Sequence, residues 1–171
     1  MIRVTKLADY GVLLMTWFAR HERMARRVRA TEPLPPASAT GLAEATGLPG
    51  PTVSKLLRQL CKADLLTSTR GVRGGYRLAR PSEAISMAEV LEAVEGPIAL
   101  TECLEDGPTC GMQARCPTQA NWGRINQALR GVLDRIPLSD MARDPLTPPP
   151  PAGTPLATPQ AAPIAGPEAS A

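Results

Sequence analysis

The sequence predicts a mainly α-helical protein with one small β-hairpin. Two short amphipathic segments joined by a tight turn fill residues 39–64, and a glycine-rich hairpin pattern follows over residues 65–79. Further along, apolar residues step by three and four across residues 117–136, which is typical of a helix that packs against another helix. Together these patterns predict a winged helix-turn-helix followed by a long dimerisation helix.

Residues 5–20 are predicted to form an amphipathic helix, because apolar side chains recur there every three or four residues. The apolar stripe consists of Leu7, Tyr10, Leu14, Trp17 and Phe18. Asp9 falls about 120° from this stripe, so we expect its carboxylate on the outward side of the helix. The basic and proline-rich residues 20–36 then predict a long loop, in which the single histidine, His21, is expected to be solvated.

The helix-turn-helix prediction depends on residues that end and begin helices. Gly47 can close the first helix in a left-handed conformation, and Pro51 suits the first turn of the second helix, where a missing N–H costs nothing. The inner face of the second helix is made of Val53, Leu56, Leu57 and Leu60. Strand-like runs over residues 65–70 and 76–79 flank the glycine-rich tip and predict the wing.

The net charge is only +3, but the charges are segregated along the chain. Residues 50–81 carry seven Lys or Arg side chains and one acid, whereas residues 82–106 carry seven acids and no Lys or Arg. The acidic block contains a predicted short helix at residues 86–95. A basic block that coincides with a helix-turn-helix indicates a surface for DNA phosphates, so we expect double-stranded DNA as a partner.

The residues expected to contact DNA share a hydrogen-bond donor and a place on the second helix or the wing. They are Thr52, Ser54, Lys55 and Arg58 on the helix and Arg70 and Arg73 on the wing. The first residues of a recognition helix lie near base edges in the major groove, and arginines on a wing reach the minor groove or its phosphates.

A narrow apolar seam predicts a helix that joins two copies of the chain. The seam consists of Trp122, Ile125, Leu129, Val132 and Ile136. Two heptads of this kind favour a homodimer, as expected of proteins that bind two-fold sites, although a groove within one chain would also accept such a face.

Three cysteines, Cys103, Cys110 and Cys116, lie within fourteen residues. In a reducing compartment so tight a group of thiols indicates a metal or redox site. Thiolates suit an iron–sulfur cluster, whereas the paired CxxC spacing usual in structural zinc sites is missing from this run. A zinc site and a cluster-free thiol switch remain as alternatives. The fourth cysteine, Cys61, is expected to be a small core residue.

The stretch PTVSKLLRQLCKADLLTSTRGVRGGYRLARP, followed by EGPIALTEC and CPTQANW, resembles the Rrf-two type of bacterial regulators over about residues 2–141. The RGxxGGY wing, the three cysteines and the Asn-Trp pair after them are its most specific features. This family includes regulators that respond to iron–sulfur status, nitric oxide and iron, and the branch that regulates SUF iron–sulfur assembly is the most similar. The resemblance implies a winged-helix homodimer that binds an iron–sulfur cluster, a 2Fe–2S rather than a 4Fe–4S cluster, through the cysteine loop.

Two departures from the family pattern affect the site. The connection over residues 20–36 is longer and more basic than usual, and Gln119 stands where the biogenesis branch has a histidine. An amide is a poor ligand for iron. In the nitric-oxide-sensing branch an aspartate near the N-terminus of the opposite subunit completes the set, and Asp9 occupies the matching position. An ordinary surface carboxylate paired with Lys6 or Arg3 is the alternative.

We therefore expect one regulator domain over residues 1–144 and a disordered tail over residues 145–171, which holds nine prolines and seven alanines. The domain divides into a DNA-binding part (1–81), a cysteine loop (97–116) and the dimerisation helix (117–136). With no visible export signal and no apolar run long enough to span a membrane, we expect a cytoplasmic protein that is not an enzyme. The predicted function is transcriptional regulation by iron–sulfur status, as a repressor of SUF-type assembly genes; alternatives are a thiol- or nitric-oxide-responsive repressor and a zinc-stapled DNA-binding protein.

Overall fold

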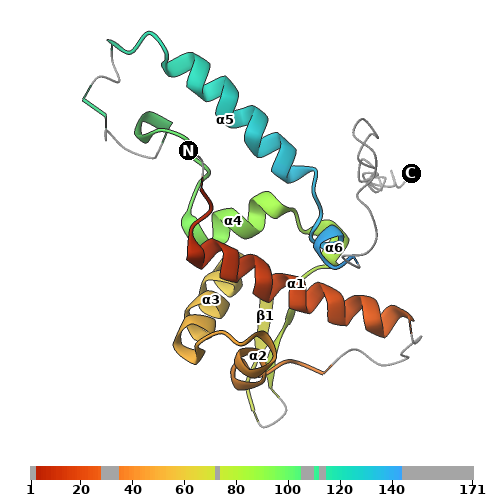
Figure 1. The fold of residues 1–171 in the computed structure, drawn as a ribbon. Helices are drawn as coiled ribbons and strands as arrows, with labels where there is room; N and C mark the ends of the chain where they lie inside the picture. Colours follow the sequence, from red (N-terminus) through yellow and green to blue (C-terminus); the bar gives the residue numbers. More distant parts are fainter. Residues whose placement is uncertain (1–2, 28–34, 72–73, 105–109, 112–114, 144–171) are drawn as a thin grey trace, which may run out of the picture.

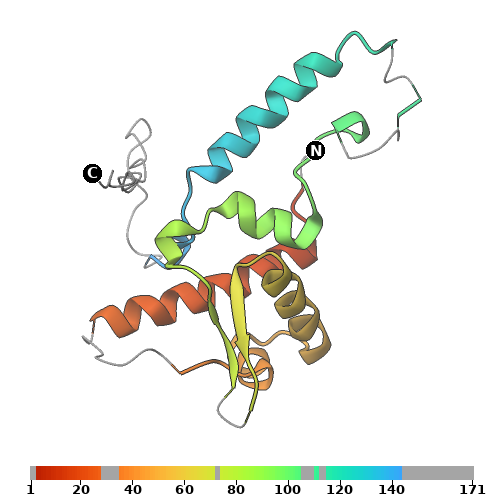
Figure 2. The same ribbon diagram turned by 180° about the vertical axis from the view of Figure 1, so that it is seen from behind.

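The computed structural model describes residues 3–27, 35–71, 74–104, 110–111 and 115–143. Most elements are helices, and the two strands form one small antiparallel hairpin (Figure 1; Figure 2). In chain order the elements are α1 (Lys6–Arg27), α2 (Ala39–Thr46), α3 (Gly50–Lys62), β1 (Leu66–Thr69), β2 (Gly75–Leu78), the 3-10 turn η1 (Ser82–Ala84), α4 (Met87–Glu95), the 3-10 turn η2 (Glu102–Leu104), α5 (Gln119–Asp134) and α6 (Leu138–Met141). The mainly α fold with a hairpin wing is thus confirmed.

The helix-turn-helix forms where the sequence predicts it. The Ser38 hydroxyl accepts a hydrogen bond from the Gly41 amide at 3.0 Å and starts α2. Gly47 ends α2 with a φ of 70°, a left-handed conformation that glycine adopts without steric cost. Pro51 lies in the first turn of α3, where its missing N–H breaks no helical bond. The four predicted inner-face residues of α3 are all fully buried.

The hydrophobic core lies where α1 crosses the shorter helices. α1 runs across the body, packed against α4, α2 and α6 (Figure 1). Its buried residues include Leu14 and Phe18 from the predicted apolar stripe, while Leu7, Tyr10 and Trp17 pack against the core with part of their surface exposed. Gly11 is also buried in α1 and lies against Val94 of α4. A small residue here lets the two helices approach closely.

The prediction of a loop from residue 20 onward is wrong for residues 20–27, because α1 continues to Arg27. This stretch consists of Arg, His, Glu, Met and Ala, contains no Gly or Pro, and therefore has good helix propensity. Contacts distant in sequence hold it: Arg26 pairs with Glu22 and with Glu83, and the Arg23 guanidinium donates to the Ala142 carbonyl at 2.7 Å. Residues 28–34 lie outside the described residues.

The wing follows α3 after a sharp change of direction. Asp64 has a φ of 55°, and the Leu65 amide donates to the Leu60 carbonyl at 3.0 Å, which closes the helix and starts β1. β1 pairs with β2 in a register that places Leu66 opposite Leu78. On the outer edge of β2, Tyr76 exchanges two backbone hydrogen bonds of 2.9 Å with Ala37, the residue that leads into α2. The outer edge of the wing is thereby tied to the segment that begins the helix-turn-helix.

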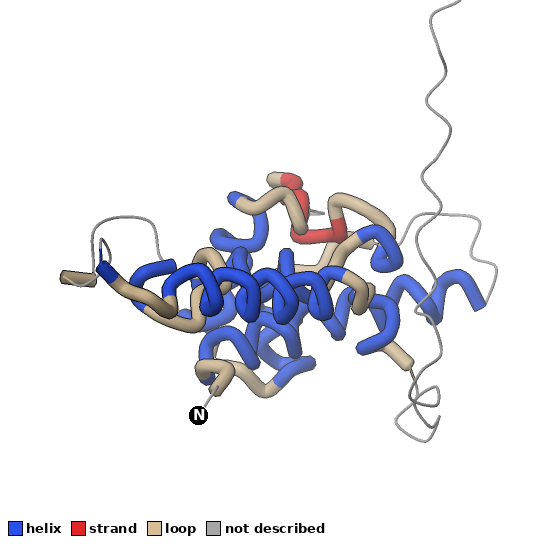
Figure 3. Tube along the Cα trace, turned by 90° about the horizontal axis from the view of Figure 1, so that it is seen from above, coloured by secondary structure: helices blue, strands red, loops and turns tan. Residues whose placement is uncertain are grey.

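α5 is the least buried helix of the molecule. It extends over α4 and away from the body (Figure 1), and Figure 3 shows the small hairpin within an otherwise helical structure. No residue of α5 is buried. Its C-terminal end is joined to α4 by the bidentate ion pair of Arg130 with Glu92, at 2.8 and 3.2 Å. No helix within the described part of the chain has the length and apolar character needed to span a membrane.

Candidate DNA-binding surface and cysteine segment

The outer face of α3 carries the side chains that the sequence predicts for base and phosphate contacts. Thr52 and Ser54 are half-buried in the first turns, and Lys55 and Arg58 are exposed. Because Pro49 supplies no side-chain cap, the first amides of α3 are not occupied by a capping side chain. Free amides and the positive end of the helix dipole favour an anion at this end.

The wing adds polar side chains beside this face. Arg70 is exposed immediately after β1, while the predicted Arg73 lies outside the described residues. Three exposed residues of β1 were missed by the sequence reasoning: Thr67, Ser68 and Thr69. β1 has one buried residue followed by three residues with hydroxyl side chains, and such side chains are not expected in a core. This run of hydroxyl residues is the signal that could have identified them.

The basic block and the acidic block differ in how many of their charged side chains form ion pairs. Within the described part of the chain, Lys55, Arg58, Arg70 and Arg77 form no ion pair. By contrast, acids of the following block are matched: Arg80 contacts Glu89 at 2.7 Å, Arg130 contacts Glu92, and Arg26 contacts Glu83. These four cations of the helix-turn-helix and the wing are therefore free to meet phosphates.

The described cysteines of the predicted loop are all free thiols and half-buried. Cys103 lies in η2 with its sulfur 3.2 Å from the Thr101 hydroxyl, and the sulfur of Cys116 lies 3.3 Å from the Thr118 hydroxyl. Hydrogen bonds from Thr118 lower the pKa of the Cys116 thiol and favour its thiolate. Thiolate character is what a metal site requires of its cysteines.

The donor types fit an iron–sulfur cluster, although the described thiols are not gathered. Among the described residues, no three His, Cys, Asp or Glu side chains lie close enough together to hold one ion. Parts of the loop, residues 105–109 and 112–114, lie outside those residues. Cys61 is different: it packs against the core, and burial raises the pKa of its thiol. Cys61 therefore lies at the edge of the core, partly buried, rather than within it.

Asn126 connects the cysteine segment, which is the predicted cysteine loop of residues 97–116, to α5. The sequence did not identify this residue. Its side-chain amide donates to the Ile98 carbonyl at 2.7 Å, and its side-chain oxygen accepts from the Leu100 amide at 3.1 Å. Both bonds hold the backbone just before Cys103 against α5. One amide side chain thus satisfies a donor and an acceptor of this irregular segment, an arrangement that no short motif would reveal.

Asp9 lies on the outward side of α1, as the helical period predicts, and is exposed. Among the described residues it forms no ion pair with Lys6, Arg3 or any other cation, so in this chain it is an unpaired surface carboxylate. Lys6 instead lies over the ring of Tyr10, 5.7 Å from its centroid. The Asp9 carboxylate is therefore available to a group outside this chain. Gln119 is the first residue of α5.

The predicted seam leaves much of its apolar surface exposed. Trp122, Ile125 and Val132 are 39%, 50% and 45% exposed, and Leu129 is half-buried. The remaining member, Ile136, lies beyond the end of α5 and packs against the core of its own chain. Its backbone carbonyl accepts from the Met87 amide at 2.9 Å, which fixes it at the start of α4. Three of the five seam residues are thus exposed, and Leu129 keeps part of its surface accessible.

Comparison with known proteins places the chain among transcriptional regulators. A family model described as "Rrf2: Iron-dependent Transcriptional regulator" matches residues 4–144. The chain is 37% identical over 143 residues to Protein rrf2 of Nitratidesulfovibrio vulgaris, covering 84% of this chain and 89% of that protein. It is 31% identical to the HTH-type transcriptional regulator IscR of Vibrio cholerae, covering 84% of this chain and 76% of that one.

Solved structures agree with the fold described above. The global cysteine regulator CymR of B. subtilis superposes with a TM-score of 0.59 at 28% identity, covering 83% of this chain and 97% of that one. IscR of T. potens superposes with a TM-score of 0.56 at 28% identity, covering 82% and 85%. These relatives are named as regulators rather than as enzymes. The chain therefore belongs to the Rrf2 family of winged helix-turn-helix transcriptional regulators.

Proposed function

We propose that this regulator binds operator DNA as a homodimer in the cytoplasm and controls transcription, by repression of SUF-type assembly genes, in response to an iron–sulfur cluster held by Cys103, Cys110 and Cys116. The observation that carries the proposal is the combination of basic side chains without ion pairs among the described residues, on α3 and the wing, with three free cysteines, Cys103, Cys110 and Cys116, in the stretch of chain before α5. The regulators named IscR among its relatives support the cluster.

The side chains of α3 and the wing suggest which residues contact bases and which contact phosphates. Thr52 and Ser54 would discriminate bases from the first turns of α3, whereas Lys55, Arg58 and the wing arginines Arg70 and Arg73 would neutralise phosphates. Hydroxyl contacts to base edges carry sequence preference, while cations bind every sequence with a strong dependence on salt.

Selection from a random duplex pool tests this division. Wild-type protein should enrich a two-fold symmetric sequence, and Thr52→Ala or Ser54→Ala should enrich a different one. Arg58→Gln and Arg70→Gln should weaken binding to all duplexes and reduce the salt slope by roughly one each. Arg143→Gln removes an exposed cation that follows α6 and pairs with Asp140, outside α3 and the wing, and is the control. Unchanged sequences and slopes in all these variants would remove α3 and the wing from the interface.

When bound, a 2Fe–2S cluster, which we favour over 4Fe–4S, would supply an oxidant- and iron-sensitive group whose loss changes the segment it is attached to. The residues of this chain would position it: the three thiols as ligands, Thr101 and Thr118 as hydrogen-bonding neighbours of two of them, and Asn126 as the link to α5. Because α5 carries the exposed apolar seam, a change in the cysteine segment would reach the dimer.

Anaerobically purified protein tests the cofactor. Iron, sulfide and visible absorption should be present in wild type and in Cys61→Ser, whose thiol packs against the core, and should be lost in the Ser variants of the three loop cysteines. Colourless protein with one zinc per chain would establish the zinc-stapled alternative. Metal-free protein that forms a disulfide on oxidation would establish the thiol switch.

For the fourth ligand we propose Asp9 from the opposite subunit. Its support is an exposed carboxylate without an ion pair among the described residues of its own chain. A carboxylate is a harder ligand than a thiolate, so a site completed by it should lose its cluster readily. Asp9→Ala should keep the fold and dimer while shortening the lifetime of the cluster absorption, and Gln119→Ala should change it little. The reverse pattern would assign the ligand to Gln119.

A further inference from the structure

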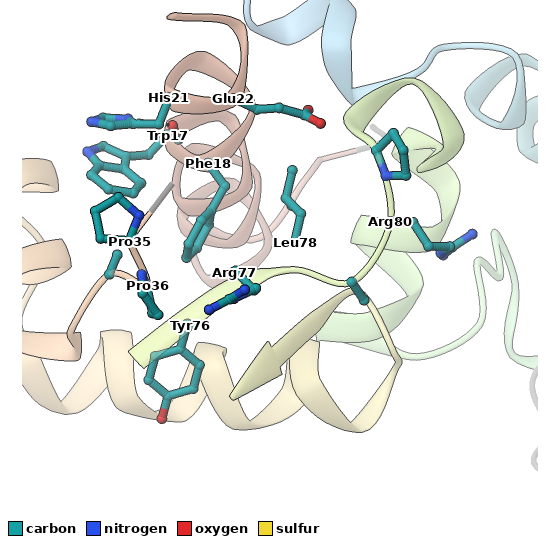
Figure 4. Close-up of a pocket in the computed structure, with 13 residues that line it drawn as sticks. Trp17, Phe18, His21, Glu22, Pro35, Pro36, Tyr76, Arg77, Leu78 and Arg80 are labelled. Atoms are coloured by element: carbon teal, nitrogen blue, oxygen red, sulfur yellow. Dashed lines mark hydrogen bonds between the residues drawn. The ribbon is translucent and has the colours of Figure 1, made fainter. Parts of the chain in front are cut away.

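A pocket that the DNA and cluster sites do not use lies between α1 and the wing. Its volume is about 500 Å³, within the range of roughly 300–1,000 Å³ that small-molecule sites occupy. The walls come from the second half of α1, from residues 35–37 before α2, and from residues 76–81 of β2 and its extension. Figure 4 shows Phe18 descending from α1 and Leu78 rising from β2 between these walls.

One wall of the pocket is a rigid aromatic surface. The rings of Trp17 and His21 stack with centroids 3.6 Å apart and planes inclined by 24° (Figure 4). The His21 Nδ1 lies 2.9 Å from the Trp17 carbonyl oxygen, and because a carbonyl only accepts, Nδ1 carries the proton and the ring orientation is fixed. The expectation that His21 is a solvated loop residue is therefore wrong. Pro35 and Pro36 add flat apolar surface beside this stack.

The outer edge of β2 leaves backbone groups available at the pocket. Tyr76 bonds Ala37 across this edge with both its amide and its carbonyl, and two residues later the groups of Leu78 point to the same side. The next residue that could pair with them is Pro35, which has no N–H to donate. The Leu78 carbonyl therefore has no strand donor beside the aromatic wall, and the Leu78 amide forms no backbone bond on this edge among the described residues.

Of the charged side chains that line the pocket, the one without an ion pair among the described residues is a cation. Glu22 lines it, but its oxygens accept from Arg26 at 2.9 Å and from the Ser82 amide at 3.0 Å. Arg80 is held by Glu89. Arg77 also lines the pocket and forms no ion pair with any described residue. A ligand that stacks on an aromatic wall and brings one negative charge would satisfy what this pocket leaves open.

We propose that this pocket is a second ligand site, distinct from the cysteine segment, that takes a small planar aromatic carboxylic acid. The ring would lie against Trp17 and the apolar walls, and the carboxylate would pair with Arg77. An occupant would touch both α1 and β2, and thus the strand that positions the wing.

Three probes that share the indole ring system but differ in charge test the proposal. They are indole-3-acetate (negative), indole-3-acetamide (neutral) and tryptamine (positive), each titrated into ¹⁵N-labelled protein. The acid should bind saturably and shift the Leu78 amide and the Trp17 indole N–H. It should bind about threefold to tenfold more tightly than the amide, as expected of a partly exposed charge pair, and tryptamine should bind weakest.

Arg77→Gln should abolish the preference for the acid over the amide while the amide binds as before. Lys62→Gln removes an exposed cation from the end of α3, outside the pocket, and is the matched control, which should keep the full preference. Overlay of the variant and wild-type spectra confirms that each variant is folded. Equal binding of all three probes, an acid preference that survives Arg77→Gln, or shifts confined to other regions would overturn the proposal.

Discussion

Gly11 of α1 lies so close to Val94 of α4 that a Cβ built on the glycine would meet the Val94 Cγ2 at 2.7 Å. Real Cβ atoms do not approach other carbon atoms so closely, so the helices or the valine would have to move. α1 and α4 form one of the main contacts of the core, and α4 also supports α5. The spacing of these two helices is therefore set by a residue with no side chain.

We expect Gly11→Ala to destabilise the protein by about 1–3 kcal/mol, the usual cost of overpacking a core. Urea unfolding measures it. Gly131→Ala is the matched control, because it makes the same change inside α5, where the nearest atom is the flexible end of Arg135 at 3.9 Å. There the gain in helix propensity should stabilise the helix by up to about 1 kcal/mol. Equal effects of the two substitutions would show that the α1–α4 contact tolerates a methyl group.

Glu89 should make stability depend on pH in the acid range. Burial opposes its ionisation, but the hydrogen bond from the Ser86 amide at 2.8 Å and the contact with Arg80 outweigh burial and lower the pKa of Glu89. A carboxyl group with a lowered folded pKa stabilises the fold above its unfolded pKa of about 4.3, and this contribution is lost as the pH falls through the folded pKa.

Glu89→Gln keeps an oxygen for the Ser86 amide but removes the charge and the oxygen that accepts from Arg80. Its melting temperature should therefore lie below that of wild type at pH 7, and the gap should close as the pH approaches 3. Glu44→Gln changes an exposed carboxylate of α2 that has no ion pair among the described residues and should leave the melting temperature nearly unchanged. A gap for Glu89→Gln that stays constant down to pH 3 would contradict a role for the ionised carboxylate.

Local patterns were sufficient to predict the helix-turn-helix. Gly47, Pro51 and the inner face of α3 are decided by backbone geometry and by apolar period, both of which are properties of neighbouring residues. The exposed candidates for DNA contact follow, because a residue opposite a buried face must face outward. Thr52 and Lys55 were therefore placed correctly on α3 without knowledge of any distant contact.

The parts that sequence reasoning missed depend on contacts between distant segments. Residues 20–27 extend α1 because Arg26 meets Glu83 and Arg23 meets the Ala142 carbonyl, more than fifty residues away in each case. The Asn126 hydrogen bonds and the α1–β2 pocket have the same origin. Ile136 fitted the heptad seam, yet it pairs with the backbone of Met87, because the chain turns at Pro137 and α6 packs back onto α1.

Asn126 provides a test of how the cysteine segment is held. Asn126→Ala removes both bonds, so exchange of the Leu100 amide with deuterium should become faster, whereas the Trp122 amide, bonded within the backbone to Thr118 at 3.0 Å, should keep its rate. Asn126→Asp keeps an acceptor for Leu100 but loses the donor to Ile98, and should give intermediate protection. Protection of Leu100 that is unchanged in Asn126→Ala would show that other contacts hold the segment.

The exposed seam on α5 leads to the last prediction, which concerns the proposed dimer. Leu129 is half-buried at the middle of a face whose other members are 39–50% exposed, on a helix with no buried residue. If a second copy covers this face, Leu129→Asp places an unpaired charge in a dry interface, which costs several kcal/mol. Sedimentation equilibrium should then show a monomer. Gln127→Asp introduces the same charge on the exposed side of α5 and should remain dimeric.

Because α5 contributes no buried residue to its own chain, the Leu129→Asp monomer should keep the circular dichroism of the wild-type protein. It should also lose affinity for a two-fold symmetric duplex more strongly than for a half-site, since only the joined pair can place two copies of α3 on one molecule of DNA. A Leu129→Asp protein that stays dimeric would mean that two chains join through another surface. A protein that unfolds would instead assign the seam to the core of the monomer.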